Sequence, residues 1–197
     1  MKIVGVGCGP GMITLNAIEA ISSAKRIYGS ERSIELVSCY ISGHCEVHAI
    51  EDYKKLKEIE DDSVVLSTGD PMLAGLGYLG GEIIPGISSM QVAFARLGLP
   101  LKNAVVVSAH GGNHRNAADE AVEWLKHGKI VFFLADPAFD VSLFREAGHY
   151  IDRDCTIAVC EHLGYHDERI ATGTIMNPPP VTSDLFSLVI GMWKGVK

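Results

Sequence analysis

The chain has 197 residues, of which 47% are hydrophobic, and a formal net charge of −7. This length and composition allow a substantial core, either in one large domain or in two small ones. The acidic balance excludes a basic nucleic-acid platform, and no apolar run approaches the roughly 20 residues that span a bilayer. We expect no nucleic-acid or membrane partner.

The five cysteines include no Cys-x-x-Cys pair, and the first residues run directly into a predicted strand without a signal peptide. Free thiols persist in a reducing compartment. The sequence therefore predicts a cytoplasmic protein without disulfides.

Apolar runs alternate with helical patterns through the first half, which predicts an α/β fold. The expected strands are residues 3–6, 25–28, 47–50, 63–66 and 83–84. The expected helices are residues 14–24, residues 52–59, and a helix from 88 or 89 to 97. Thr14 and Asp52 are the expected N-caps of the first two helices.

The string Leu-Gly-Leu-Pro-Leu at 97–101 interrupts this pattern and is the expected hinge. We therefore expect two domains, residues 1–101 and 102–197. In the second domain the expected strands are 104–107 and 130–134, and the expected helices lie near 116–126 and 139–147. The runs 156–160, 169–172 and 185–190 follow without helices between them, which predicts antiparallel pairing and a mixed sheet. The Asn-Pro-Pro-Pro string at 177–180 cannot join a central ladder.

Three glycine-rich segments each follow an expected strand of the first domain. They are Gly-Val-Gly-Cys-Gly-Pro-Gly at 5–11, Ser-Thr-Gly-Asp-Pro-Met at 67–72 and Ile-Pro-Gly-Ile-Ser-Ser-Met at 84–90. Glycine lets the backbone turn tightly and approach a ligand without an intervening Cβ. Three such turns at the carboxyl ends of parallel strands predict a crevice for a small, nucleotide-like molecule.

The first turn has two alternative interpretations. A strand, glycines and a helix in this order suggest a dinucleotide site, and Glu31 lies where a ribose-binding acid is expected. The glycine spacing differs from Gly-x-Gly-x-x-Gly, however, and Pro10 lacks an amide that a pyrophosphate would use. No Gly-Lys-Ser/Thr follows, which excludes a nucleotide triphosphatase P-loop. Taken alone, the turn is equally compatible with a structural role.

The second and third turns are also open to two interpretations. Asp70 is either the cap of a short helix that begins at Pro71 or a carboxylate that faces a cationic or hydroxyl-rich ligand. The hydroxyls of Ser88 and Ser89 either cap the next helix or bind a ligand at its N-terminus. The three turns at this spacing are far rarer than any one of them.

The strings at 4–14, 69–71 and 85–89 resemble the three N-terminal signatures of the tetrapyrrole methylases. Cys-Glu-His-Leu-Gly at 160–164, Glu-Arg-Ile at 168–170 and Thr-Gly-Thr at 172–174 resemble a later motif of the same family. The resemblance covers nearly the whole chain. It implies two α/β domains of the tetrapyrrole methylase type with the methyl-donor site in the cleft between them, usually in a homodimer.

The resemblance implies S-adenosyl-L-methionine as the methyl donor and S-adenosyl-L-homocysteine as the product. Carried over motif by motif, the residues expected at the donor are Cys8, Gly69, Asp70, Leu73, Ser88, Ser89, Met90, Ala135, Cys160 and Phe186. The last three rest on an approximate alignment of strands.

The string Tyr-Gly-Ser-Glu-Arg at 28–32 is similar to one branch of the family, which methylates carbon 5 of cobalt-precorrin-7 in anaerobic cobalamin biosynthesis. The resemblance implies a cobalt-precorrin substrate, with the enzyme that methylates and decarboxylates at C15 as a further partner. That branch shows a Ser-x-His-Gly-Arg string after the hinge. Here Ser-Ala-His-Gly-Gly at 108–112 has Gly112 in place of the arginine, and Arg115 lies three residues further on.

The substrate that the resemblance implies carries many carboxylates, so we expect basic residues on the acceptor side of the site. His110 and Arg115 are the candidates, with His114 beside them; each has a solvated loop position as its alternative, and Arg32 either pairs on the surface or touches substrate. The reaction needs no protein nucleophile, and the sequence singles out no catalytic residue. His44, Cys45 and His48 form one short cluster without a second ligand pair, so we expect no metal site.

Two other hypotheses remain open. One is another branch of the family, acting on a different corrinoid carbon, on ribosomal RNA or on a protein. An RNA substrate predicts a basic face, which this acidic chain lacks. The other is a non-catalytic module that senses a nucleotide and would bind the donor without turnover.

Overall fold

The computed structural model describes residues 1–147, 151–152 and 154–193, and the chain divides into two compact units, Met1–Ser89 and Met90–Lys197. The sequence placed the domain boundary later, at 101/102. The residues between the two positions include helix α4 (Ser89–Arg96). All of α4 except Ser89 belongs to the second unit, where Phe94 packs edge-on against Phe132 with ring centroids 6.4 Å apart.

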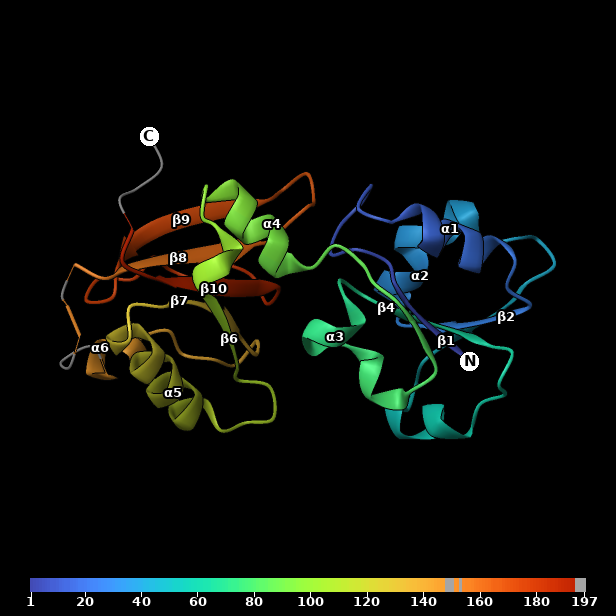
Figure 1. Ribbon diagram of the computed structural model, residues 1–197, viewed down its shortest axis with the longest axis horizontal. Helices are drawn as coiled ribbons and strands as arrows, with labels where there is room; N and C mark the ends of the chain where they lie inside the picture. Colours follow the sequence, from blue (N-terminus) through green and yellow to red (C-terminus); the bar gives the residue numbers. More distant parts are fainter. Residues whose placement is uncertain (148–150, 153, 194–197) are drawn as a thin grey trace. The chain divides into compact units, whose positions relative to one another are not determined.

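The first unit contains a five-stranded sheet in the order β3-β2-β4-β1-β5 (Figure 1). Its strands are β1 (Lys2–Gly5), β2 (Arg26–Gly29), β3 (Glu46–Ala49), β4 (Val64–Ser67) and β5 (Glu82–Ile84). All pairs are parallel, and each predicted strand lies within one residue of its observed position. The central strand β4 is buried along its whole length, as expected for a parallel sheet that is covered on both faces.

Helices cover both faces of this sheet. On one face lie α1 (Leu15–Ser22) and α2 (Glu31–Val37), followed by the short η1 (Ser38–Tyr40). On the other face lie η2 (Tyr53–Glu58) and η3 (Leu76–Leu79), after the short α3 (Pro71–Ala74). Thr14 caps α1 through its hydroxyl, as predicted.

Two predictions for these helices need correction. The segment expected as an α-helix at 52–59 is a 3-10 helix, although Asp52 caps it as predicted, with its Oδ1 accepting the amide of Lys54. Helix α2 was not predicted at all. It is short and rich in polar residues, and the hydroxyl of Ser30, which accepts the amide of Ser33, was the signal for its start.

The second unit contains a mixed sheet in the order β6-β7-β10-β8-β9. Its strands are β6 (Ala104–Ser108), β7 (Ile130–Leu134), β8 (Thr156–Glu161), β9 (Arg169–Thr174) and β10 (Phe186–Gly191). Strands β6 and β7 are parallel, while β10 pairs antiparallel with both β7 and β8, and β8 with β9. The predicted antiparallel element is therefore confirmed.

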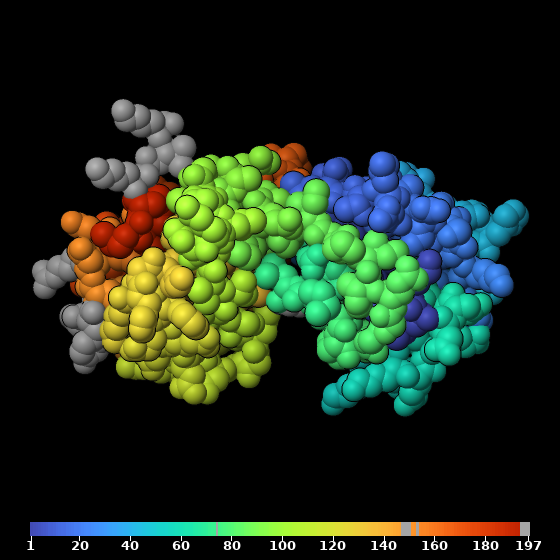
Figure 2. Space-filling model, in the orientation of Figure 1, coloured from blue at the N-terminus to red at the C-terminus, as the bar shows by residue number. Residues whose placement is uncertain are grey.

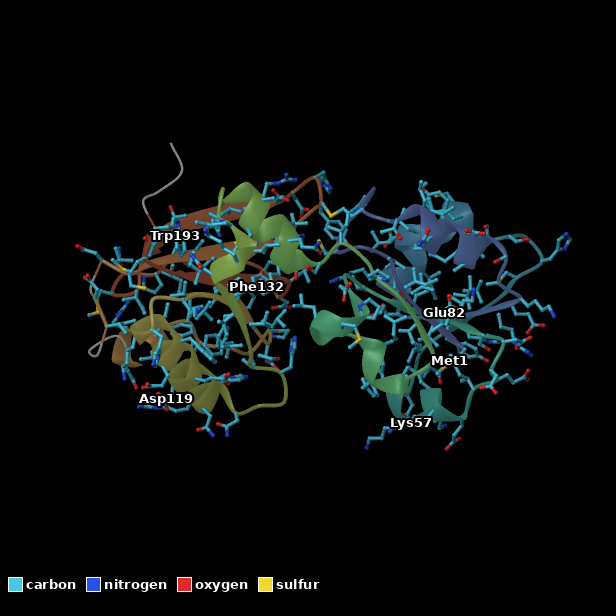
Figure 3. The ribbon with its side chains drawn as sticks, viewed as in Figure 1. Met1, Lys57, Glu82, Asp119, Phe132 and Trp193 are labelled. Carbon is cyan, nitrogen blue, oxygen red and sulfur yellow. The ribbon has the colours of Figure 1, made fainter. Side chains whose placement is uncertain are left out.

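Helices α5 (His114–Lys126) and α6 (Leu143–Ala147) pack on one face of this mixed sheet. The contact between Phe94 and Phe132 places α4 on the opposite face, and the short η4 (Leu101–Asn103) leads from there into β6. Figure 3 shows Phe132 inside the unit and Asp119 of α5 at its surface. Among the described residues, no helix combines the length and the apolar character that a membrane span requires.

Candidate functional site

The three glycine-rich turns meet at the carboxyl edge of the first sheet, because β4, β1 and β5 are neighbouring parallel strands. The amide of Gly69 donates to the carbonyl of Gly7 at 2.8 Å, and the amide of Gly7 donates back to Gly69 at 3.3 Å. The amide of Cys8 donates to the carbonyl of Ile87 at 3.0 Å. The first turn is therefore bonded directly to the second and to the third.

Two glycines are required by this close packing of backbone on backbone. A Cβ on Gly86 would lie 2.2 Å from the carbonyl oxygen of Gly69 and 2.8 Å from the carbonyl carbon of Gly5. A Cβ on Gly5 would lie 2.5 Å from the amide nitrogen of Gly86. Contacts among the turns themselves therefore require glycine at both positions, whether or not a ligand binds there.

Both carboxylate oxygens of Asp70 accept backbone amides. Oδ1 accepts from Met72 at 2.8 Å and caps α3, and Oδ2 accepts from Gly86 at 3.1 Å in the third turn. The capping interpretation is therefore correct. Each carboxylate oxygen has a second lone pair, so the same group can also accept a hydrogen bond from a ligand hydroxyl or ammonium. The chemistry of this edge thus fits a cationic, hydroxyl-bearing donor, and a donor contact of Asp70 stays a prediction.

The remaining donor-site candidates near these turns differ in position. Cys8 is buried, with its Sγ 3.5 Å from the Sδ of Met12, and Ser88 is buried next to Gly69. Ser89 begins α4 and Leu73 lies within α3. Met90 is counted with the second unit. The first unit therefore brings together Cys8, Gly69, Asp70 and Ser88.

In the second unit, the candidates gather at one edge of the mixed sheet. The carboxyl ends of β6, β7 and β8 and the amino ends of β9 and β10 share this edge, because β10 and β9 run antiparallel to their neighbours. Ala135 follows β7, and Phe186 begins β10; both side chains belong to the core on the α5 face. Cys160 of β8 pairs with Ser187, so it lies at the same edge on the other face.

The thiol of Cys160 is not set up as a nucleophile. Burial, together with the nearby carboxylates of Glu168 and Glu161, raises its pKa to about 12. A thiolate is the reactive form of cysteine, so the neutral thiol acts as a small packing residue.

The predicted substrate residues lie after β6. His110 is exposed, and Arg115, on the outer side of α5, pairs through Nη1 with Oε2 of Glu146 at 2.9 Å (Figure 2 shows this helix at the surface of the second unit). The two side chains are 66% and 63% exposed, and such a pair contributes only about 0–1 kcal/mol, so a substrate carboxylate can compete for the arginine. His114 is less exposed and lies against Phe139, with Nε2 3.6 Å from Oδ1 of Asp136.

The structure places His44, Cys45 and His48 at and just before β3. The ring of His48 stacks on Tyr28 with centroids 4.8 Å apart. No group of three metal-binding side chains occurs within residues 1–147, 151–152 and 154–193.

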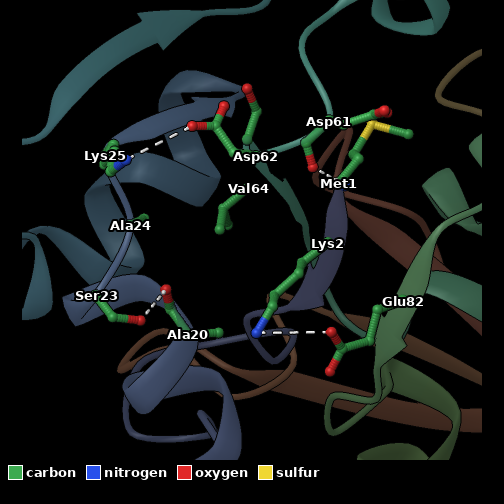
Figure 4. Close-up of a pocket in the computed structure, with 11 residues that line it drawn as sticks. Met1, Lys2, Ala20, Ser23, Ala24, Lys25, Asp61, Asp62, Val64 and Glu82 are labelled. Carbon is green, nitrogen blue, oxygen red and sulfur yellow. Dashed lines mark hydrogen bonds and ion pairs between the residues drawn. The ribbon is translucent and has the colours of Figure 1, made fainter.

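A pocket of about 310 Å³ lies at the opposite, amino edge of the first sheet (Figure 4). Lys2 pairs there with Glu82 at 3.6 Å, and Lys25 pairs with Asp62 at 4.0 Å. Both lysines of the pocket therefore already have carboxylate partners, and none of the predicted site residues lines it.

Comparison with known proteins gives consistent matches. A model of the tetrapyrrole (corrin/porphyrin) methylases matches residues 2–178. The chain is 30% identical over 185 residues to the probable cobalt-precorrin-7 C(5)-methyltransferase of Methanocaldococcus jannaschii, covering 84% of this chain and 86% of that protein. It is 31% identical over 124 residues to the decarboxylating precorrin-6Y C(5,15)-methyltransferase of a Sinorhizobium species, covering 56% of this chain and 30% of that longer protein.

Among solved structures, the chain is similar to the cobalamin biosynthesis precorrin-6Y methylase of Archaeoglobus fulgidus. The TM-score is 0.74 at 29% identity, and the match covers 97% of this chain and 96% of that one.

Proposed function

The chain belongs to the tetrapyrrole (corrin/porphyrin) methylases, and from that membership we propose that it transfers a methyl group from S-adenosyl-L-methionine to carbon 5 of cobalt-precorrin-7. The substrate and the carbon atom follow the name of the Methanocaldococcus relative, which matches this chain over most of both lengths. The product of the donor is S-adenosyl-L-homocysteine.

One observation carries the proposal: three glycine-rich turns are bonded together at the carboxyl edge of a parallel sheet, in a chain of this family. Edges of this kind are where α/β sheets bind nucleotide-like ligands. The carboxylate of Asp70, which is negatively charged, lies at this edge and suits a donor whose sulfur is cationic.

When bound, the donor supplies a methyl group on a sulfonium. The acceptor carbon takes this methyl group and the neutral thioether leaves, so no protein nucleophile is needed. The task of this chain is therefore to bind and orient, and holding the two reactants at near-attack distance is worth up to about 7–11 kcal/mol. The residues that we propose for donor binding are Cys8, Gly69, Asp70, Leu73, Ser88, Ser89, Met90, Ala135, Cys160 and Phe186. No residue is assigned as a catalytic base.

We propose that His110 and Arg115 bind the carboxylates of the corrinoid. A chain of net charge −7 needs a local cation to bind a polycarboxylate, and the exposed guanidinium of Arg115 can bind a carboxylate in a bidentate way. His110, at the end of β6, is exposed at the same edge as Ala135 and Phe186.

For partners, we propose a homodimer and a functional link to an enzyme that methylates and decarboxylates at C15. The name of the Sinorhizobium relative combines methylation at both positions with decarboxylation in one longer protein. We also propose a cytoplasmic location, because all five cysteines are free and a reducing compartment keeps thiols unpaired.

The test is mass spectrometry of cobalt-precorrin-7 after incubation with the protein and S-adenosyl-L-methionine. A gain of one methyl group, absent when the donor is replaced by S-adenosyl-L-homocysteine, is the expected result. NMR of the product then identifies the carbon atom. Binding of the donor without methylation of this substrate would discard the substrate and favour another branch of the family.

A further inference from the structure

A buried carboxylate at the end of β8 accepts hydrogen bonds from three residues in two other parts of the chain. Glu161 is only 2% exposed. Its carboxylate accepts the amide and the hydroxyl of Thr182, the amide of Ser183 at 3.0 Å, and the guanidinium of Arg169. We call these four residues the Glu161 cluster.

The carboxylate of Glu161 is held in its charged form. Burial by itself raises the pKa of Glu161, but the hydrogen bonds from the Thr182 amide and from Arg169 outweigh it, so that the pKa lies below its usual value. A buried charge is tolerated only when it is paired and hydrogen-bonded. The Glu161 cluster therefore depends on the charge as well as on the shape of this side chain.

The cluster attaches a segment that otherwise lacks ladder hydrogen bonds. Thr182 and Ser183 follow three prolines, which have no amide to donate, and β10 begins only at Phe186. Leu185 completes the attachment, because its carbonyl accepts the amide of His162 at 3.1 Å. Residues 182–185 are thus bonded to Glu161, the last residue of β8, and to His162, which follows it.

His162, the residue after Glu161, contributes a second set of contacts. His162 has a left-handed backbone, with φ of 49°, which is uncommon for a residue other than glycine. Its Nε2 contacts the hydroxyl of Ser183, and its Nδ1 lies 2.8 Å from Oδ2 of Asp167. The side chain of Ser183 is therefore held as well as its backbone.

The attached segment leads directly into the residues assigned to the donor. Phe186 is the cross-strand partner of Glu161 in the β8–β10 ladder, and Cys160 immediately precedes Glu161. A shift of residues 182–185 would move the start of β10 relative to the end of β8. That shift would change the spacing between Phe186 and Cys160.

We propose that Glu161 is a positioning residue for the methyl donor, which it does not touch: its carboxylate fixes residues 182–185 and thereby sets the position of Phe186 relative to Cys160, which lies at the same edge on the other face of the sheet. The inference rests on the proposed function, since Phe186 and Cys160 are assigned to the donor through the family.

Glu168 offers a matched control. It lies in the same region of the chain, between β8 and β9, and is also a hydrogen-bonded carboxylate. Its oxygens accept from Nε of Arg96 and from the amide of Gly164, both at 2.7 Å. The change from Glu to Gln is therefore chemically the same at both positions, but only the side chain of Glu161 is hydrogen-bonded to residues 182 and 183.

The experiment is calorimetric titration of S-adenosyl-L-homocysteine into the full-length wild type, Glu161→Gln and Glu168→Gln, with thermal melting of each. Oε1 of Glu161 accepts the amides of both Thr182 and Ser183, and Oε2 accepts from Arg169, so the single oxygen of Gln can keep the two amides only by placing its NH2 group against the guanidinium. The negative charge is lost as well, and losing one charge-assisted hydrogen bond corresponds to about tenfold in an equilibrium constant. We expect about tenfold weaker binding by Glu161→Gln and less than about twofold for Glu168→Gln. In turnover, the KM for the donor rises and the KM for the corrinoid does not.

Wild-type affinity in a folded Glu161→Gln protein overturns the inference, whatever its melting temperature. If that variant does not fold, Thr182→Val removes the hydroxyl contact alone and keeps the amide. It should weaken donor binding by about threefold, and an unchanged affinity overturns the inference equally. Failure of the wild type to bind S-adenosyl-L-homocysteine refutes the proposed donor itself, which distinguishes that failure from the others.

Discussion

The side chain of Asp70 has two structural roles. Its oxygens cap α3 and bind the amide of Gly86, so they connect the second turn to the third. The sequence raised capping and ligand binding as alternatives for this residue. The geometry makes them compatible, because the bonds that cap the helix also fix the carboxylate at the edge where the donor is proposed to bind.

Asp70→Ala removes both bonds and should weaken the binding of S-adenosyl-L-homocysteine, measured by calorimetry, while lowering stability by about 1–2 kcal/mol as other lost N-caps do. Asp52→Ala is the matched control, since Asp52 caps η2 in the same unit through the same type of bond to Lys54. We expect that control to lower stability without changing the affinity. An affinity unchanged in Asp70→Ala would remove Asp70 from the donor site.

Arg115 carries the prediction for the substrate side. Arg115→Ala should raise the KM for the corrinoid by about tenfold, the cost of one charged hydrogen bond, and leave the KM for the donor nearly unchanged. Glu146→Gln removes the present partner of Arg115 and should leave the KM for the corrinoid equal or lower. Steady-state kinetics with each substrate varied in turn separates the two effects, and equal effects on both KM values would contradict the assignment.

At the scale of elements, helix α4 shows how a short helix is fixed by one large side chain. Phe94 is 1% exposed and contacts the ring of Phe132 on the face of the mixed sheet away from α5. The eight residues of α4 are too few for a stable isolated helix. Its position therefore depends on this buried contact.

Phe94→Ala should destabilise the second unit by about 3–5 kcal/mol, because truncation of a buried phenylalanine loses apolar burial and leaves a cavity. Both tryptophans of the chain, Trp124 and Trp193, belong to this unit, so their fluorescence during urea unfolding reports on it. Leu101→Ala, at a position 46% exposed, should change the stability by less than about 0.5 kcal/mol. A similar loss in both variants would mean that α4 is not anchored by Phe94.

The elements also show what could be predicted from sequence. Strands such as β4 and β7 were predicted within a residue because a strand that is buried on both faces is a continuous apolar run. The polar α2 lacked such a run and was missed. The donors to Glu161 could not be predicted, because Thr182 and Ser183 lie 21 and 22 residues further along the chain and no local pattern links them to it.

For the whole molecule, the two units differ in construction, and two buried thiols should make the stability of the second unit depend on pH. Burial raises the pKa of Cys155 to about 11 and that of Cys160 to about 12. A raised pKa means that folding favours the neutral thiol. Its contribution is complete below the ordinary thiol pKa of about 8.5 and is lost as the pH rises toward the folded values.

The stability of the second unit, measured by tryptophan fluorescence in urea, should therefore be level from about pH 7 to 8 and fall above about pH 9. Replacing Cys155 and Cys160 by alanine should flatten that fall, although the cavities lower the stability at every pH. Replacing the exposed Cys39 should leave the slope as it is. An equally steep fall without the two buried thiols would assign it to other groups.

The reciprocal bonds between Gly7 and Gly69 have a consequence for how the first unit opens. An amide exchanges its hydrogen with solvent only when its bond breaks, and the amides of Gly7, Cys8 and Gly69 bind carbonyls of other turns, not of their own. None of the three can be released by fraying of a single loop. In deuterated water they should exchange together, at one rate, which makes these glycine-rich turns behave as part of the rigid sheet and not as loops.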